Sequence, residues 1–221
     1  MLTPFTFTDV SIVNMARPRT IPDDEKAQRA KYHHGDLKRA LTDAALQLVQ
    51  EKGPRGFTLR EVARRAGVSA AAPYRHFADK SQLLAAAAAQ GFVQLHEALD
   101  ATVAANPDLS DQAVAMGKAY VQWAVTHPDY YQVMFGSELD KTESPEVLTA
   151  GARAFDDLLD TIKRCQQAGL LPANDPHATA GPIWSLLHGI SMLTIGSDLT
   201  HVGIREETEA LTERSLRQLL F

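Results

Sequence analysis

The residues with the clearest chemical potential lie between Thr58 and Phe77, in the stretch TLREVARRAGVSAAAPYRHF. Its end carries a phenol, a guanidinium and an imidazole, on Tyr74, Arg75 and His76. Tyr74 and His76 can donate hydrogen bonds to phosphates, and Arg75 can reach a phosphate or a guanine. The alanines before them are small enough to let the backbone approach base edges, where a methyl group can contact a thymine methyl. This combination predicts contacts with DNA.

Two short helices joined by a Gly-containing turn would position these side chains, as in a helix-turn-helix. The first is expected over 59–66, because Thr58 and Glu61 form a capping box and Gly67 can adopt the left-handed conformation that ends a helix. In such a unit the second helix enters the major groove and the first crosses the phosphate backbone. Helix starts at Thr58 and Ser69 would also offer N–H groups to phosphate.

The second helix of this unit is expected from Ser69 to about His76. Pro73 occupies an early position in it and removes one hydrogen bond, so the helix is expected to start one or two residues late. Lys80, at the start of the next helix, adds a phosphate ligand. An alternative stays open, in which these segments form a three-helix core whose polar face meets only water.

The same region resembles the DNA-binding domain of the TetR family of bacterial transcriptional regulators. The resemblance covers residues 32–90, and the segment YHHGDLKRALTDAALQLVQEKG is similar to that family's first helix. The other matching residues are Thr58, Val62 with Ala63, the turn Ala66-Gly67-Val68-Ser69, the block Tyr74-x-His76-Phe77, Lys80, and the pair Leu83-Leu84.

The resemblance implies roles for individual side chains. Phe77 would be a core residue at the junction of the third and fourth helices. Contacts to the DNA backbone are implied for Thr58, Ser69, Tyr74, His76 and Lys80, and contacts to bases for Ala70, Ala71 and Arg75.

Charge is distributed unevenly along the 221 residues, whose formal net charge is −5. Residues 1–80 carry 14 Lys and Arg against 9 Asp and Glu, whereas residues 81–221 carry 8 against 18. The basic part can neutralise phosphates, and the acidic part is expected to have a separate function. Cys165 is the single cysteine, which excludes an internal disulfide and suits a reducing cytoplasm.

The start of the chain lacks the features of a secretory signal, and no apolar run reaches the roughly 18 residues of a membrane span. We therefore expect a cytoplasmic protein with no membrane partner. The change in composition at Met15 suggests that this residue is the native start.

The pattern of apolar residues predicts an all-α fold of about nine helices. We expect a flexible N-terminal arm over 1–31, a helix-turn-helix DNA-binding domain over 32–80, and a helical effector-binding and dimerisation domain over 81–221. The expected helices span about 36–52, 59–66, 69–76, 79–104, 110–127, 129–136, 144–168, 175–197 and 203–219.

Aromatic residues and methionines in the C-terminal part suit an apolar pocket for a small molecule. The segment WSLLHGISML is similar to a Trp-x-x-x-His-Gly signature of one TetR subgroup. For each residue, ordinary core packing remains the alternative, and His188 has no second ligand at i+3 or i+4 that would make a metal site. The pocket candidates are Tyr120, Trp123, Tyr131, Met134, Phe155, Cys165, Trp184, His188 and Met192.

The helices over 175–197 and 203–219 are expected to form a dimer interface, since two DNA half-sites require two reading domains. The apolar strips are Leu186, Leu187, Ile190, Leu193 and Ile195 on the first helix, and Leu211, Leu216, Leu219 and Leu220 on the second.

These observations favour a homodimeric regulator, most simply a repressor that a small apolar ligand releases from its DNA operator. Two other classes stay open. The helix-turn-helix could bind a protein partner, or the chain could be an all-α enzyme, although it has no Gly-rich phosphate loop, nucleophile elbow or HExxH motif. We expect no cofactor, no metal and no catalytic residue.

Overall fold

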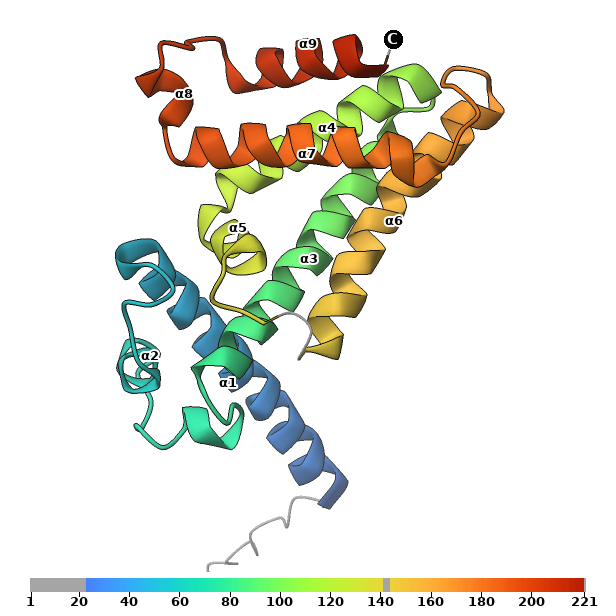
Figure 1. The fold of residues 1–221 in the computed structure, drawn as a ribbon. Helices are drawn as coiled ribbons and strands as arrows, with labels where there is room; N and C mark the ends of the chain where they lie inside the picture. Colours follow the sequence, from blue (N-terminus) through green and yellow to red (C-terminus); the bar gives the residue numbers. More distant parts are fainter. Residues whose placement is uncertain (1–22, 141–143, 221) are drawn as a thin grey trace, which may run out of the picture. The chain divides into compact units, whose positions relative to one another are not determined.

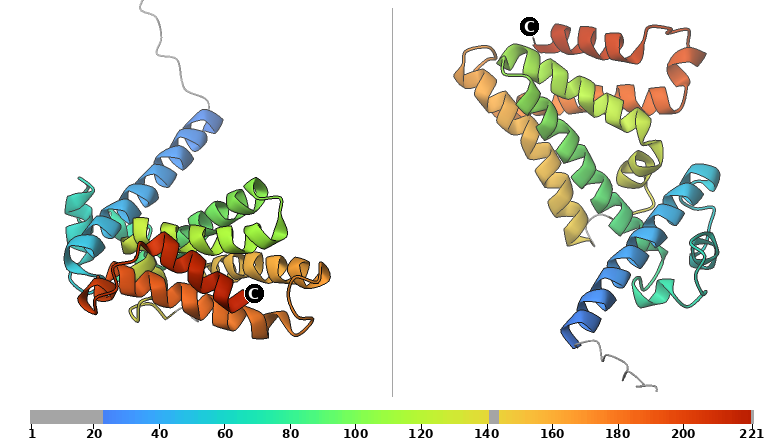
Figure 2. Two further views of the ribbon diagram at one scale, coloured as in Figure 1. Left: turned by 90° about the horizontal axis from the view of Figure 1, so that it is seen from above. Right: turned by 180° about the vertical axis from the view of Figure 1, so that it is seen from behind.

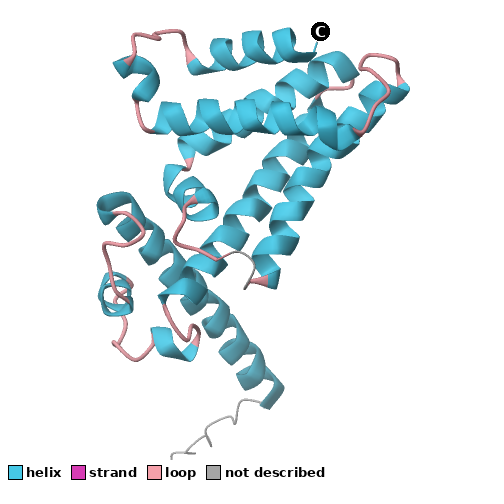
Figure 3. Ribbon diagram, in the orientation of Figure 1, coloured by secondary structure: helices cyan, strands magenta, loops and turns pink. Residues whose placement is uncertain are grey.

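The computed structural model describes residues 23–140 and 144–220, and helices are the only regular structure in this part of the chain (Figure 3). The all-α prediction is confirmed. Side chains are described for residues 37–140 and 144–220, and every site below lies in the compact unit Lys38–Phe221. The elements in Figure 1 are α1 (Asp23–Lys52), α2 (Leu59–Arg65), the 3-10 helix η1 (Pro73–Arg75), α3 (Lys80–Ala105), α4 (Leu109–Thr126), α5 (Pro128–Phe135), α6 (Pro145–Gln167), α7 (Pro176–Ile195), α8 (Asp198–His201) and α9 (Thr208–Leu220).

The first helix is longer than the sequence pattern indicated. α1 begins at Asp23, so the expected start near Asp36 is wrong, and residues 23–31 are helical rather than an irregular arm. The segment DDEKAQRAKY lacks an apolar repeat but consists mainly of good helix formers, with acidic residues first, where they complement the helix dipole. The remainder of the arm, 1–22, with Met15, lies outside the described residues.

The helices expected to form the DNA-binding domain bury an apolar core. α1 buries Leu41, Ala45 and Leu48, and α2 buries Leu59, Val62 and Ala63. These side chains recur at three- and four-residue spacing, so one face of each helix leaves water.

Two local signals around α2 are confirmed. Thr58 and Glu61 form the capping box, with the Glu61 N–H donating to Thr58 Oγ1 over 3.3 Å and the Thr58 N–H donating to Glu61 Oε2 over 2.9 Å. Gly67 follows with φ of 69°, which a side chain would strain. Phe77 is 3% exposed, so it is a core residue, as the resemblance implied.

The C-terminal helices pack around a long pair. α3 and α6 run side by side, and α4 contacts α3, α6, α7 and α9 (Figures 1 and 2). α9 approaches α4 closely, because a Cβ at Gly117 would lie 2.5 Å from Leu216 Cδ1. None of the described helices combines the length and apolar character that a membrane span requires.

The connection between α7 and α9 differs from the expected loop. It contains α8, a single helical turn, and Gly203 then adopts φ of 85°. α9 consequently starts at Thr208, whereas the sequence suggested a start near 203.

Candidate nucleic-acid interface and ligand cavity

The segment expected to be the second helix of the helix-turn-helix is not an α-helix. Residues 70–72 form a turn, and η1 follows as a 3-10 helix, so the predicted helix from Ser69 to His76 is wrong. Pro73 has no N–H to donate to the Ser69 carbonyl, and its ring disfavours the α-helical position there. The backbone uses i to i−3 hydrogen bonds instead, from Ala72 N to Ser69 O (2.9 Å) and from Arg75 N to Ala72 O (3.2 Å).

The side chains predicted to contact DNA are mostly accessible in this turn. Tyr74 is 55% exposed, while His76 is half-buried beside the core residue Phe77. Ala72 and Pro73 are buried, which anchors the turn on the apolar core. The predicted contact residues that are exposed are Thr58, Ser69, Ala70, Ala71, Tyr74 and Arg75.

The Thr58 hydroxyl already has a structural partner. It accepts from the Glu61 N–H and lies 3.1 Å from Glu61 Oε2. The Lys52 ammonium, 2.7 Å from Glu61 Oε1, together with the Thr58 N–H and hydroxyl, lowers the pKa of Glu61 to about 2. A phosphate contact from the Thr58 hydroxyl would therefore compete with the capping box, and it stays a prediction.

Lys80 is held by the backbone that precedes α2. Its ammonium donates to the carbonyls of Pro54 (3.0 Å), Phe57 (3.2 Å) and Arg55 (3.4 Å). It also lies 4.9 Å from the centroid of the Phe57 ring. An ammonium group has three N–H donors, so these carbonyls can occupy all of them. Lys80 therefore fastens the loop after α1 to the start of α3, and its contact with phosphate stays a prediction.

Two cations on α2 were missed by the sequence interpretation. Arg60 and Arg64 are exposed, and their guanidinium groups have no ion pair or hydrogen bond with any described residue, whereas the neighbouring Arg65 is paired with Glu51 at 2.7 Å. They stand at i and i+4, so they share one face of α2, opposite the buried Val62. The sequence signal for these residues was the spacing of two like charges at i and i+4. Such a pair destabilises a helix slightly, and a bound anion would relieve the repulsion.

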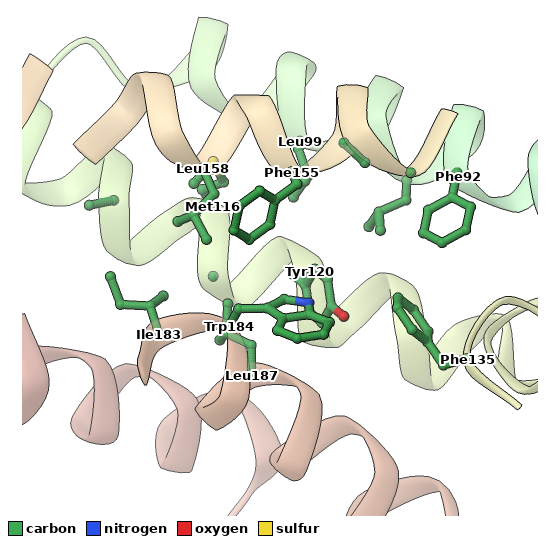
Figure 4. A pocket seen from close by; sticks show the side chains of 15 residues that line it. Phe92, Leu99, Met116, Tyr120, Phe135, Phe155, Leu158, Ile183, Trp184 and Leu187 are labelled. Carbon is green, nitrogen blue, oxygen red and sulfur yellow. The ribbon is translucent and has the colours of Figure 1, made fainter. Parts of the chain in front are cut away.

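A separate cavity of about 260 Å³ lies among the C-terminal helices (Figure 4). α3, α4, α6 and α7 supply most of its wall, and α5 supplies Phe135. Of the nine pocket candidates, Tyr120, Phe155 and Trp184 line it. The wall also includes residues that sequence reasoning missed, namely Phe92, Leu95, Leu99, Ala113, Met116, Gly117, Phe135, Gly151, Ala154, Leu158, Ile183 and Leu187.

The other six candidates lie outside the cavity lining. Trp123 stacks on His127 with ring centroids 4.9 Å apart. Met134 is fully buried, Cys165 lies with its Sγ 3.6 Å from the Leu109 carbonyl, and Met192 is 46% exposed. The remaining two, Tyr131 and His188, connect to the cavity through hydrogen bonds.

A short chain of polar groups begins at the cavity wall. The hydroxyls of Tyr120 and Tyr131 lie 3.0 Å apart, and the Tyr131 hydroxyl lies 2.8 Å from His188 Nδ1. Burial raises the pKa of both phenols, so both are neutral hydroxyls at ordinary pH. The Trp184 indole N–H, which lies beside the Tyr120 oxygen in Figure 4, opposes that shift for Tyr120.

The apolar strips assigned to a dimer interface face partly inward. Leu187, Ile190 and Leu216 are buried within the chain itself, so their assignment to an intermolecular strip is wrong. They pack inward because α7 and α9 both contact α4 and each other. The large apolar side chains that α7 and α9 expose are Trp184 (39%), Met192 (46%), Leu193 (43%) and Leu219 (44%).

Two protein-family models match the chain. The model described as "Bacterial regulatory proteins, tetR family" matches residues 41–87. The model described as "Tetracyclin repressor-like, C-terminal domain" matches residues 113–219. The first match contains α2 and η1, and the second contains most of the residues that line the cavity.

Individual relatives agree with these matches. A region of 119 residues is 30% identical to an HTH-type transcriptional regulator of Mycobacterium tuberculosis, covering 52% of this chain and 50% of that protein. The chain thus spans about half the length of this curated relative. A solved structure from Rhodococcus sp. RHA1, of unknown function, is 30% identical with a TM-score of 0.75, over 86% of this chain and 96% of the other. FadR from Bacillus subtilis, solved with stearoyl-CoA, shares the fold, with a TM-score of 0.69, 14% identity and coverage of 82% and 97%.

Proposed function

The chain belongs to the TetR family of bacterial regulatory proteins, and from this premise we propose that it is a transcriptional regulator that binds a DNA operator. In this proposal it acts as a homodimer in the cytoplasm, where it represses transcription until a small apolar ligand releases it. α2 and η1 would contact the DNA, α7 and α9 would join two copies, and the cavity would hold the ligand.

The observation that carries the DNA-binding proposal is the set of exposed side chains on α2 and η1. Arg60, Arg64 and Arg75 are exposed and have no ion pair with a described residue, and the exposed Tyr74 directly precedes Arg75. Guanidinium groups match phosphates and guanine edges, and neutralised phosphates release counterions. Ala70 and Ala71 leave room for a close approach to the duplex.

A gel shift with the DNA upstream of this protein's own gene tests the proposal. We expect specific binding whose affinity falls steeply as salt rises, because each neutralised phosphate contributes about −0.9 to the slope of log K against log salt. The absence of any specific complex with that DNA would contradict control of its own gene.

The protein-interaction alternative makes a different prediction for the same residues. Arg75→Ala or Tyr74→Ala should weaken DNA binding and leave folding and dimerisation intact, since both side chains are exposed. A module that binds a protein through this surface would have no DNA affinity to lose.

The exposed face of α7 supports a dimer interface. Gly181 and Gly189 are separated by eight positions on this helix, and a Cβ at either one would meet no described atom within 4 Å apart from its chain neighbours and the nearby backbone of α7 itself. The exposed Met192 and Leu193 lie one turn beyond Gly189, so apolar side chains adjoin a site where another helix can approach closely.

A single substitution separates this role from a role in folding. Gly189→Arg meets open space in one copy of the chain, so it should leave the protomer folded and convert the dimer to a monomer in sedimentation velocity. Leu148→Arg, at a 50% exposed position on α6, is the matched control and should remain dimeric. A dimer that survives Gly189→Arg would contradict this interface.

α3 gives the cavity a physical connection to the DNA-binding part. It begins with Lys80, which holds the loop before α2, and it also contributes Phe92, Leu95 and Leu99 to the cavity wall. Arg55 of that loop donates to Glu138 and, over 3.4 Å, to the Ser137 hydroxyl, between α5 and α6. A ligand that prefers one position of α3 would therefore shift the population of DNA-binding states.

Release by a ligand is tested with a compound identified in a thermal-shift screen. Such a compound should weaken the gel-shift complex, because an allosteric coupling of about 1–3 kcal/mol lowers affinity between 5- and 150-fold. A compound that binds in the cavity without changing DNA affinity would contradict the coupling. Repression is a separate claim, and it would be contradicted if transcription of a reporter gene were higher with the regulator present than without it.

A further inference from the structure

The chemistry of the cavity wall identifies a class of ligand, an inference that rests on the proposal that the cavity is the effector site. None of the described residues that line it carries a charge, and Tyr120 and Trp184 are the only ones with a polar side-chain atom. A carboxylate, phosphate or ammonium group in this cavity would lose its hydration without gaining a partner. The wall therefore disfavours a charged group held within the cavity.

The polar group at the wall is held in a fixed place. The Tyr120 hydroxyl lies 3.0 Å from that of Tyr131, which is fully buried and lies 2.8 Å from His188 Nδ1. The ring of Tyr131 meets that of Tyr120 edge-on, at 83° and 6.1 Å between centroids. Packing and hydrogen bonding together restrict the rotation of Tyr120, so its oxygen presents a defined hydrogen-bonding direction.

The chain of three groups leaves hydrogen-bonding capacity at Tyr120. A tyrosine hydroxyl has one donor and two acceptor positions. The contact with Tyr131 uses one of these, whichever atom donates, and an approach by the Trp184 N–H would use one acceptor position. One further position on the Tyr120 oxygen remains for a ligand. In Figure 4 this oxygen lies beside the Trp184 indole, on the side of Phe135.

We propose that the effector is a neutral, largely apolar molecule that carries one hydrogen-bonding oxygen, a hydroxyl or a carbonyl, and that Tyr120 binds this oxygen. Tyr131 and His188 are positioning residues that hold the Tyr120 hydroxyl in place. The apolar body of the ligand would contact rings such as Phe92 and Phe155, while its oxygen would meet the wall's hydroxyl.

Three probes of one ring system test the proposal: naphthalene, 2-naphthol and 2-naphthoate. Isothermal titration at neutral pH gives a Kd for each with the wild-type chain and with Tyr120→Phe. The ratio of the naphthalene Kd to the 2-naphthol Kd should fall by roughly 3- to 10-fold in Tyr120→Phe, as expected for one lost hydrogen bond. 2-Naphthoate should bind about 10-fold or more weakly than 2-naphthol, because its carboxylate finds no partner.

Tyr130→Phe is the matched control. Tyr130 is also buried, but its hydroxyl accepts from Gln94 Nε2 over 3.2 Å, and it does not line the cavity. Loss of the Tyr130 hydroxyl should leave the ratio of the naphthalene Kd to the 2-naphthol Kd unchanged, even if the stability of the protein falls. Tyr131→Phe should lower the ratio, because Tyr120 then loses the partner that orients it. A purely structural effect would change both affinities together and not their ratio.

The outcomes separate the inference from the proposed function. If naphthalene and 2-naphthol bind but the ratio is the same in wild type and Tyr120→Phe, the role of Tyr120 is overturned, while the ligand cavity stands. If 2-naphthoate binds as tightly as 2-naphthol, the neutral class is overturned. If none of the three probes binds, the cavity itself is not an effector site, and both proposals fail.

Discussion

The ammonium group of Lys80 donates to the carbonyl of Phe57 over 3.2 Å and lies 4.9 Å from the centroid of the same residue's ring. This relationship ties the first turn of α3 to the loop that leads into α2. The family resemblance assigned Lys80 to phosphate, whereas its contacts in the structure give it a role in stabilising the DNA-binding part.

Lys80→Met separates these two roles. The carbonyls of Pro54 and Phe57 would lose a charged donor, so the free energy of unfolding should fall by about 1–3 kcal/mol, measured by urea denaturation. Lys163→Met, at a side chain 49% exposed and paired with Asp160 on α6, should change it by less than about 0.5 kcal/mol. Unchanged stability with a smaller salt slope of DNA binding would instead favour the phosphate contact.

The cations of α2 and η1 should act through phosphate or base contacts. Arg60→Ala and Arg64→Ala should each reduce the magnitude of the salt slope by about 0.9 when the lost contact is to a phosphate. If Arg75 contacts a base, Arg75→Ala should weaken binding to the preferred sequence by about 1–3 kcal/mol and make the protein less selective at that base pair. The measurement is fluorescence anisotropy of a labelled duplex at several salt concentrations.

Lys163→Ala is the control for these arginine variants, since Lys163 is an exposed cation on α6. It should leave the slope unaltered. Equal slopes for wild type and both α2 variants would exclude α2 from the interface.

Pro73→Ala should restore the helix that the sequence otherwise favours. An alanine at this position has an N–H that can donate to the Ser69 carbonyl, and Ala70, Ala71 and Ala72 are strong helix formers. We expect helical Cα chemical shifts and slower amide exchange from Ala71 to His76. Retention of the turn would show that the buried side chain of Ala72, rather than Pro73, determines the local conformation.

The capping box at Glu61 should make stability depend on pH in a defined direction. The Lys52 ammonium and the Thr58 donors hold the Glu61 pKa at about 2, below the ordinary value of 4.5. Between these two pKa values the Glu61 carboxyl group binds fewer protons in the folded state than in the unfolded state. The stability that the Glu61 charge contributes is therefore complete above pH 4.5 and is lost as pH falls toward 2.

Urea denaturation of Glu61→Gln from neutral pH downward tests this prediction. The variant should be less stable than wild type near neutral pH, and the difference should shrink below about pH 4.5. Glu97→Gln, at an exposed α3 position with no ion pair among the described residues, should show no such convergence. A difference that stays constant with pH would contradict the role of the Glu61 charge.

Local signals in the sequence predicted most of the fold. The capping box at Thr58, the left-handed Gly67 and the apolar face of α1 each depend on residues near in sequence, and each is confirmed. The start of α1 was missed, because residues 23–35 have helix propensity but no apolar period. The turn at Pro73 was only partly predicted. Pro73 was expected to delay the start of the helix, but in the structure it prevents an α-helix despite the three alanines before it.

The cavity was harder to predict than the fold. Aromatic and methionine side chains look alike in the sequence whether they line a cavity or fill a core, so Met134 and Trp123 were candidates and Phe92 was not. Leu216 and Leu219 likewise belong to one apolar pattern on α9, but Leu216 is buried in the packing of α9 against α4, whereas Leu219 is exposed. Such choices depend on contacts between helices distant in sequence.

The central claim is that α2 and η1 present a surface that reads duplex DNA, and selection from a random duplex library measures it most directly. Purified protein should enrich one sequence with two inverted half-sites, and Arg75→Ala should lose that enrichment while remaining folded. Enrichment of no sequence by the folded protein, or the same enrichment with Arg60, Arg64 and Arg75 all replaced by alanine, would contradict the account.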